Sequence, residues 1–116
     1  MHAVLNEQIW TAKSQEFREA VYSLLGYRLD FLQNGRVRCT SMFSTSTDQA
    51  FIFDGEEGTM QLVSQEAVDK NREWFEGVKS FFDFWVNERE TIPGFLAALT
   101  LKLYDRSASE QEMRGR

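Results

Sequence analysis

The dipeptide Asn34-Gly35 is the feature that most constrains the fold of this chain. Both residues tolerate positive φ, as the two central positions of a type I′ turn require. Apolar and polar side chains alternate over 27–31, just before the dipeptide, in the rhythm of a half-buried strand. The sequence therefore predicts an antiparallel hairpin in which 27–33 pairs with 36–43.

Two further strands follow the hairpin. A polar loop at 44–48 precedes a short strand at 50–53, and the turn that begins at Asp54 precedes another strand at 59–63. Because each connection is short, the four strands are expected to form a meander in chain order.

Helices are predicted before and after the four strands in the sequence. Beyond Ser64, apolar residues recur at spacings of three and four, and Thr91 is positioned to cap a last helix with Pro93 in its first turn. The fold class is therefore α+β, with a long N-terminal helix, a four-stranded antiparallel meander sheet and C-terminal helices. The globular head spans 26–106, and the polar residues 107–116 are expected to form a disordered tail.

The first helix is predicted to be too long for its own domain to cover. Residues 5–25 contain no glycine or proline, and Gly26 is a plausible C-cap. Its apolar residues include a seam with the spacing of a short coiled coil. We therefore expect 1–25 to form the end of a dimeric coiled coil whose interface is made by Trp10, Phe17, Val21 and Leu24.

Composition excludes several classes of function. The chain of 116 residues has 13 basic and 18 acidic residues and a formal net charge of -5, so it has no basic surplus for nucleic acid. With Cys39 and His2 as the single cysteine and histidine, it lacks the residues for a structural zinc site, a disulfide or a Cys–His or Ser–His catalytic pair. We expect no enzyme activity, cofactor or metal.

No membrane insertion is expected either. A bilayer-spanning helix needs about 20 apolar residues in succession, and no stretch of this chain approaches that length. The N-terminus also lacks the pattern of a signal peptide. These observations favour a soluble intracellular protein.

Two local features allow a functional and a structural interpretation. The acidic turn 54–58 lacks the ligand spacing of a calcium-binding loop, so a solvated turn is the simpler interpretation. Cys39 lies on the Val37 face of the predicted strand and, without a histidine partner, is expected to pack as a small hydrophobic residue.

Aromatic residues are concentrated in the predicted helices after the sheet. Because successive helical residues differ by about 100° in direction, these rings cannot all share one apolar stripe. Most are expected to fill the core, with Phe84 or Phe81 partly exposed. The alternative is a small-ligand or lipid-binding domain whose pocket is the aromatic cluster 74–85. The cluster consists of Trp74, Phe75, Phe81, Phe82, Phe84 and Trp85.

Basic residues form a local group on the first helix and the hairpin. Scattered solvated charges are one interpretation, and a site for a phosphorylated peptide is the other, since arginine offers a bidentate fork to phosphate. The members of the group are Lys13, Arg18, Arg28, Arg36 and Arg38.

Several motifs together resemble a known family over most of the chain, roughly 10–104. They are Gln15-Glu16-Phe17-Arg18, Tyr22, Gly26-Tyr27-Arg28-Leu29-Asp30, Arg38-Cys39-Thr40-Ser41-Met42-Phe43, Phe51-Ile52-Phe53, Met60-Gln61-Leu62 and Ile92-Pro93-Gly94-Phe95-Leu96-Ala97-Ala98-Leu99-Thr100-Leu101. In order and approximate spacing they resemble the C-terminal domain of the mitotic arrest deficient 1 family. Members of this family are scaffolds of the spindle assembly checkpoint.

The resemblance implies a non-catalytic, parallel homodimer in mitosis, joined through the first helix. It implies a kinetochore-targeting module that binds a phosphorylated segment of the Bub checkpoint kinase and helps present the anaphase-promoting-complex activator for inhibition. A HORMA-domain checkpoint partner binds an upstream segment of such scaffolds. The implied locations are the nucleus, the kinetochore and, in interphase, the nuclear envelope.

One departure from the family concerns the kinase contact. The family carries a basic Arg-Leu-Lys tripeptide on the first helix, and the positions that correspond to it here are Leu5-Asn6-Glu7. Glu7 repels a phosphate. Arg18 does match the family pattern and is the candidate phosphate contact that the resemblance supplies, whereas Lys13 is added on the charge argument alone.

Overall fold

The computed structural model describes the backbone of residues 2–114 and the side chains of residues 12–108. Helices flank an antiparallel sheet, so the predicted α+β class is confirmed. In chain order the elements are α1 (His2–Leu25), β1 (Tyr27–Phe31), η1 (Gln33–Gly35), β2 (Arg36–Ser41), β3 (Ala50–Asp54), β4 (Thr59–Leu62), α2 (Gln65–Lys70), α3 (Arg72–Phe82), η2 (Asp83–Glu88) and α4 (Ile92–Arg114).

The sheet is the predicted meander, with strand order β1-β2-β3-β4 and antiparallel neighbours. Asn34 and Gly35 have φ of 62° and 72°, as the predicted turn requires. The N–H of Leu32 donates to the carbonyl of Arg36 at 2.8 Å, so Gln33 is an extra residue beside the turn. This bulge shifts the register so that Tyr27 lies opposite Ser41.

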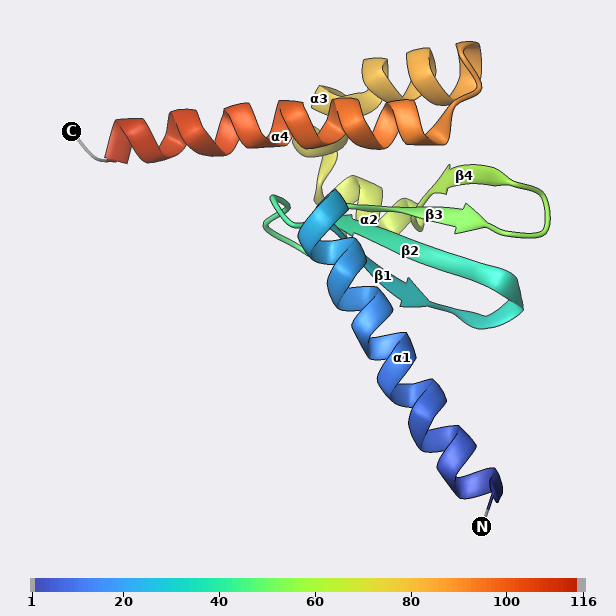
Figure 1. Cartoon of the computed structure of the whole chain (residues 1–116). Helices are drawn as coiled ribbons and strands as arrows, with labels where there is room; N and C mark the ends of the chain where they lie inside the picture. Colours follow the sequence, from blue (N-terminus) through green and yellow to red (C-terminus); the bar gives the residue numbers. More distant parts are fainter. Residues whose placement is uncertain (1, 115–116) are drawn as a thin grey trace.

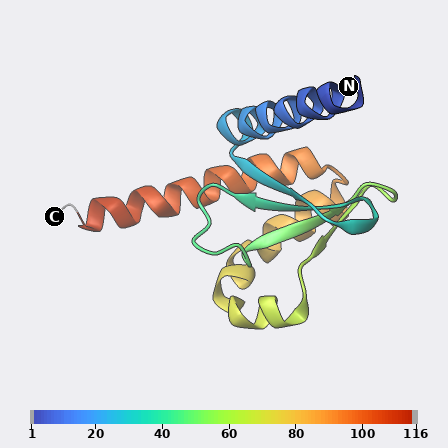
Figure 2. The ribbon, with the colours of Figure 1, turned by 90° about the horizontal axis from the view of Figure 1, so that it is seen from below.

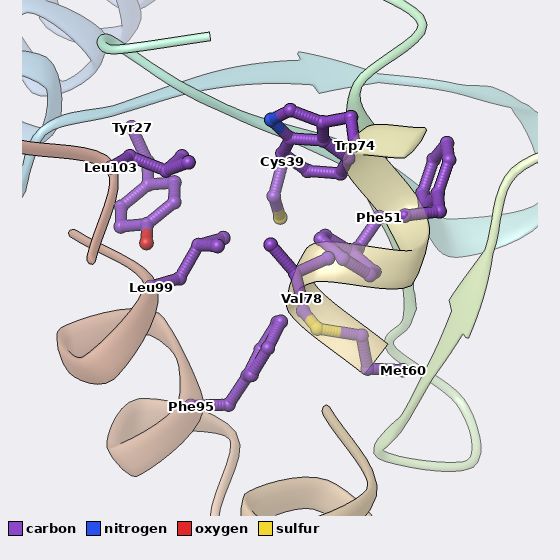
Figure 3. Packing of buried hydrophobic residues seen from close by; sticks show 10 residues of the cluster. Tyr27, Cys39, Phe51, Met60, Trp74, Val78, Phe95, Leu99 and Leu103 are labelled. Carbon is purple, nitrogen blue, oxygen red and sulfur yellow. The ribbon is translucent and has the colours of Figure 1, made fainter. Parts of the chain in front are cut away.

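One face of the sheet forms the hydrophobic core with α3 and α4 (Figure 3). Phe51 lies at its centre and is 1% exposed, with the ring of Phe95 at 4.9 Å and that of Phe82 stacked at 5.4 Å between centroids. Sheet and helices contribute about equally to the cluster. Its buried members are Tyr27, Cys39, Phe51, Met60, Trp74, Phe75, Val78, Phe95, Leu99 and Leu103.

Two of the helices after the sheet, α2 and α4, begin at side-chain caps. The Ser64 hydroxyl accepts from the N–H of Ala67 at 3.3 Å before α2, and the Thr91 hydroxyl accepts from the N–H of Gly94 at 3.1 Å in the first turn of α4. The predicted cap at Thr91 is therefore confirmed. Gly77 does not interrupt α3, which is followed without a gap by the wider π-helical turn η2.

The C-terminal segment differs from the expectation of a disordered tail at 107–116. In the structure α4 continues to Arg114. The physical reason lies in the residue types, because no glycine or proline occurs from Phe95 until Gly115. Glutamate, glutamine and alanine tolerate a solvent-exposed helix well, so polarity alone does not end one.

The two long helices extend beyond the packed head. The radius of gyration is 16.5 Å, whereas a compact domain of this length has one of about 13 Å. Figure 1 shows α1 projecting from the sheet with its N-terminal end away from α3 and α4, and both Figure 1 and Figure 2 show the C-terminal part of α4 extending past the sheet. The chain therefore presents more surface on α1 than its own domain covers.

Candidate interaction surface on the first helix

An apolar face of α1 is open to solvent. Phe17 is 59% exposed and Leu24 is 81% exposed, while Val21 between them is half-buried. At about 100° per residue these three side chains fall within about 60° of one another around the helix. Trp10 belongs to α1, but its side chain lies outside the described residues. Phe17, Val21 and Leu24, the described part of the predicted seam, therefore form one stripe that is exposed at its two ends.

The opposite side of α1 faces β1. Gly26, with φ of 78°, adopts the left-handed conformation that glycine tolerates, and its N–H donates to the carbonyl of Tyr22 at 2.9 Å. This C-cap ends the helix and turns the chain directly into the sheet. A groove of about 320 Å³ lies between the two elements and is lined by Arg18, Glu19, Tyr22, Ser23, Arg28, Leu29 and Asp30.

Basic and acidic side chains meet in this groove. Asp30 holds two guanidinium groups, with Arg28 Nε 3.3 Å from one carboxylate oxygen and Arg38 Nη2 3.3 Å from the other. Arg18 stands over the ring of Phe31, with its guanidinium carbon 5.2 Å from the ring centroid. Arg18 and Arg28 balance Glu19 and Asp30, so the lining of the groove is neutral in a chain whose net charge is -5, and Arg38 adds a positive charge beside it.

The side chain of Arg38 leaves one donor unused. Its Nε atom is buried and has no hydrogen-bond partner among the described residues. A buried unpaired donor costs free energy, so Arg38 is held at a cost by its ion pair with Asp30. Arg18 and Arg28, which line the groove from two elements, can hold an anionic group.

Lys13 lies apart from that groove. It forms an exposed ion pair with Glu16 at 3.7 Å. Because five residues separate Lys13 from Arg18, the two side chains leave the helix about 140° apart. The structure therefore places Lys13 beside the exposed apolar stripe and Arg18 beside β1. Their predicted roles in binding stay predictions.

Sequence reasoning identified the arginines but missed the residue that organises them. Arg36, which belongs to the same basic group, lies exposed at the start of β2 and does not line the groove. Asp30 was not singled out, because its position opposite Arg38 depends on the extra residue Gln33 in the hairpin. A two-residue turn would place Asp30 opposite Cys39 instead, so the sequence carried no signal for this charged pair.

No alternative chemistry gathers elsewhere in the described residues. Burial raises the pKa of the Cys39 thiol to about 11, so the thiolate that a nucleophile needs is disfavoured, and the side chain packs in the core as expected. Within the part of the chain that the structure describes, no three His, Cys, Asp or Glu side chains gather as a metal site. None of the described helices combines the length and apolarity needed to cross a bilayer.

The aromatic cluster 74–85 mainly fills the interior. Trp74 and Phe75 are buried and contact each other at 4.8 Å between centroids, and both contact Phe51. Phe84 is 38% exposed and packs against Trp85 at its edge, as the helical spacing predicts. Most of these rings therefore belong to the core or pack against it, as expected.

Comparison with known proteins identifies the family. The family described as "MAD: Mitotic checkpoint protein" matches residues 5–108. The chain is 52% identical over 101 residues to the spindle assembly checkpoint component mad1 of Schizosaccharomyces pombe, a match that covers 87% of this chain and 14% of that protein. It is 36% identical over 103 residues to the component MAD1 of Yarrowia lipolytica, with 86% and 14% covered.

A more distant relative is the human mitotic spindle assembly checkpoint protein MAD1, 29% identical over 103 residues, with 86% of this chain and 13% of that protein covered. The chain thus spans about one seventh of the length of these relatives. The matched region contains the exposed stripe of α1, the arginine groove and the whole sheet. Sequence motifs and comparisons agree, and this chain belongs to the MAD family of mitotic checkpoint proteins.

Proposed function

We propose that this chain is a non-catalytic, dimeric binding module of a spindle assembly checkpoint scaffold. It recognises a phosphorylated segment of the Bub checkpoint kinase. The observation that carries the proposal is the pairing, on one helix, of an exposed apolar stripe with an arginine-lined groove. The names of the relatives, all checkpoint components, support the same process.

The dimer forms through α1, with two copies of the helix side by side and parallel. Phe17, Val21 and Leu24 supply the described part of the interface, and Trp10 extends it by one heptad. Exposed side chains as large as Phe17 and Leu24 leave substantial apolar area in water, and a second helix removes it. The 24 residues of α1 give a helix of about 36 Å, long enough for such a seam.

The phosphate of the receptor segment binds in the groove beside β1. Arg18 approaches from α1 and Arg28 from β1, so a phosphate between them accepts charge-assisted hydrogen bonds from two elements. Asp30 orients Arg28 and prevents the groove from being uniformly basic. This selects an anion of high charge density over weaker carboxylates. Lys13, on the neighbouring side of the helix, adds a contact to the flanking peptide.

Dimerisation raises the affinity for a clustered receptor. Each protomer offers one groove, and the two are related by the symmetry of the dimer. Once one phosphorylated segment is bound, a second one nearby binds with a high effective concentration. The module therefore favours sites where many receptor segments are phosphorylated together.

Further partners and locations belong to the same proposal and are supported by the family resemblance. They are presentation of the anaphase-promoting-complex activator, recruitment of a HORMA-domain partner through an upstream segment of the scaffold, and residence in the nucleus, at the kinetochore and at the nuclear envelope in interphase. No step of this role needs catalysis.

The test is a fluorescence-anisotropy titration with the phosphorylated and unphosphorylated kinase segment at two salt concentrations. We expect phosphate-dependent binding that weakens at high salt, because exposed charges are screened. Arg18→Glu lowers the affinity at least tenfold, while Arg36→Glu, a charge change of the same size outside the groove, lowers it less than threefold. Lys13→Glu has an intermediate effect.

The proposal fails if both peptides bind equally, or if Arg18→Glu and Arg36→Glu weaken binding by the same factor. The first result removes the phosphate from the contact. The second result shows that only the overall charge of the chain matters.

A further inference from the structure

A second interaction surface lies at the opposite edge of the sheet. The strand order places β4 at an edge, so alternate residues of Thr59–Leu62 direct their backbone N–H and C=O groups away from β3. Edge strands are commonly protected by lysine, proline or a covering element. The sequence of β4 is Thr-Met-Gln-Leu, which has no such residue.

An open apolar hollow adjoins one end of β4. It has a volume of about 380 Å³ and lies between Leu62 and the helices α2 and α3. Its floor is made by the buried side chains of Phe75 and Val78, and its walls by Val68 and Phe82. Leu62 is 46% exposed at its rim, on the same face of the sheet as the core. A bulky apolar side chain of a partner fits this space.

A second hollow adjoins the other end of the strand. It is lined by Thr59 and Met60 of β4, by Val86 of η2 and by Ile92 and Pro93 of α4, and has a volume of about 620 Å³. The two hollows thus lie along the same strand, which Figure 1 shows at the edge of the sheet nearest to η2. Side chains two residues apart on an added strand stand about 6.8 Å apart on one face. An added strand therefore presents side chains on one face at regular intervals along β4.

The rim of these hollows is acidic. Arg72 pairs with Asp69 at 3.4 Å, which leaves Lys79 as the other basic residue against three further acidic ones. The acidic residues are Glu76, Asp83 and Glu90. The charge favours a ligand that carries lysine or arginine next to its apolar residues.

We propose that the β4 edge binds an extended segment of a partner protein as a fifth strand. The segment has bulky apolar residues at alternate positions, which enter the two hollows, and lysine or arginine residues that face the acidic rim. Its backbone hydrogen-bonds to β4, and its side chains supply specificity, as in other cases of strand addition. Because β1 and β4 are opposite edges, this surface is separate from the arginine groove and is occupied independently of it.

To test this proposal, a library of random nine-residue peptides is screened for binding to the whole chain. Selected sequences are synthesised and titrated by fluorescence anisotropy. We expect alternating apolar residues with at least one lysine or arginine. Leu62→Lys lowers the affinity at least tenfold, because it places a cation at the rim of the hollow. Leu32→Lys is the matched control, since Leu32 is 44% exposed but lies beyond β1, and it changes the affinity less than twofold.

Backbone pairing is tested on the peptide and on the chain. Alternate amides of a bound peptide strand face β4, and the others face away from it. N-methylation of the amides that face β4 lowers the affinity at least tenfold, whereas N-methylation of the amides that face away has little effect. In the unmodified protein, hydrogen exchange of β4 amides slows when the peptide binds.

Three results would overturn the proposal. One is that the screen yields no binder. The same conclusion follows if the binders have apolar residues at helical spacing, or acidic or phosphorylated residues in place of lysine and arginine. Another is that binding does not respond to Leu62→Lys. The third is that the chain associates with itself through β4, so that Leu62→Lys abolishes a concentration-dependent tetramer, because the occupant is then a second copy.

Discussion

The helices α1 and α4 have nearly equal lengths, 24 and 23 residues, but use their apolar residues in opposite ways. In α4, Phe95, Leu99 and Leu103 recur every four residues and are all at least 96% buried against the sheet and α3. In α1, Phe17 and Leu24 are mostly exposed. Packing within the chain therefore explains Phe95, Leu99 and Leu103 of α4 and leaves Phe17 and Leu24 of α1 unexplained.

The two helices also differ in how they are tied to β1. The hydroxyl of Tyr27 donates to the carbonyl of Leu96 and accepts from the hydroxyl of Thr100, so β1 is fixed to α4 by side chains. The link from α1 to β1 is the continuous chain through Gly26 and the contact of Arg18 with the Phe31 ring. The described side chains of α1 other than Val21 are exposed, so this helix is suited to present a surface to a partner.

Truncation of a buried ring on α4 has the largest expected effect. Phe95→Ala leaves a cavity beneath Phe51 and Phe82, and lowers the free energy of unfolding by about 3–5 kcal/mol. Leu101→Ala, on the exposed side of the same helix, changes it by less than about 0.5 kcal/mol. Denaturant unfolding followed by circular dichroism measures both. Equal losses would contradict the assignment of the core.

Alkaline pH is expected to lower the free energy of unfolding almost as much as Phe95→Ala does. Burial raises the pKa of Cys39 to about 11 and that of Tyr27 to about 12, above their ordinary values of 9.0 and 10.0. The folded state therefore holds protons that the unfolded state loses. Stability is fully present below pH 9 and falls by about 3–4 kcal/mol from pH 8 to pH 11, at 1.36 kcal/mol per unit of pKa.

The control for this pH dependence is Cys39→Ala, which removes the thiol. Unfolding midpoints measured from pH 8 to pH 11 fall less steeply for this variant. A decline of the same steepness with and without the thiol would exclude Cys39 as a source of the effect.

A smaller effect is expected where α4 begins. A Cβ atom at Gly94 meets the Trp85 ring and the Thr91 methyl group, each at 2.8 Å, so no side chain fits there without movement. Gly94→Ala is expected to lower the free energy of unfolding by about 1–3 kcal/mol. Gly77→Ala, in open space on α3, is neutral or stabilising. Thermal unfolding of both variants separates crowding from helix propensity.

The smallest effect concerns the hydroxyl that ties β1 to α4. Tyr27→Phe removes its hydrogen bonds but leaves the Leu96 carbonyl with the Thr100 hydroxyl, which donates to it at 2.8 Å. The expected loss is about 1 kcal/mol, the usual contribution of one hydrogen bond. Denaturant titration measures it. If the free energy of unfolding fell as much as in Phe95→Ala, the Tyr27 hydroxyl would contribute far more than one hydrogen bond, and this expectation would be wrong.

The sequence was most informative where local chemistry decides the structure. Asn34-Gly35 predicts its turn and Thr91 its cap, because both act through backbone geometry within a few residues. The extra residue Gln33 in the hairpin was not predictable, since register depends on which side chains reach the core. The continuation of α4 to Arg114 was missed because polarity was taken as a sign of disorder.

For the candidate site, the sequence supplied residue types but not their neighbours. Arg18 and Arg28 were recognised as basic, yet their meeting in one groove depends on the angle at which Gly26 joins α1 to β1. The edge position of β4 follows from the meander, whereas its two hollows depend on where α2, η2 and α4 pack. Tertiary contacts of this kind are not encoded in any short motif.

The central claim is that the exposed stripe of α1 joins two copies of the chain. Sedimentation equilibrium tests it most directly, with circular dichroism to confirm that each variant is folded. We expect a dimer for the parent chain and for Leu101→Asp, which charges a similarly exposed site on α4, and a folded monomer for Phe17→Asp. A monomeric parent chain, or a Phe17→Asp variant that remains a dimer, would contradict it.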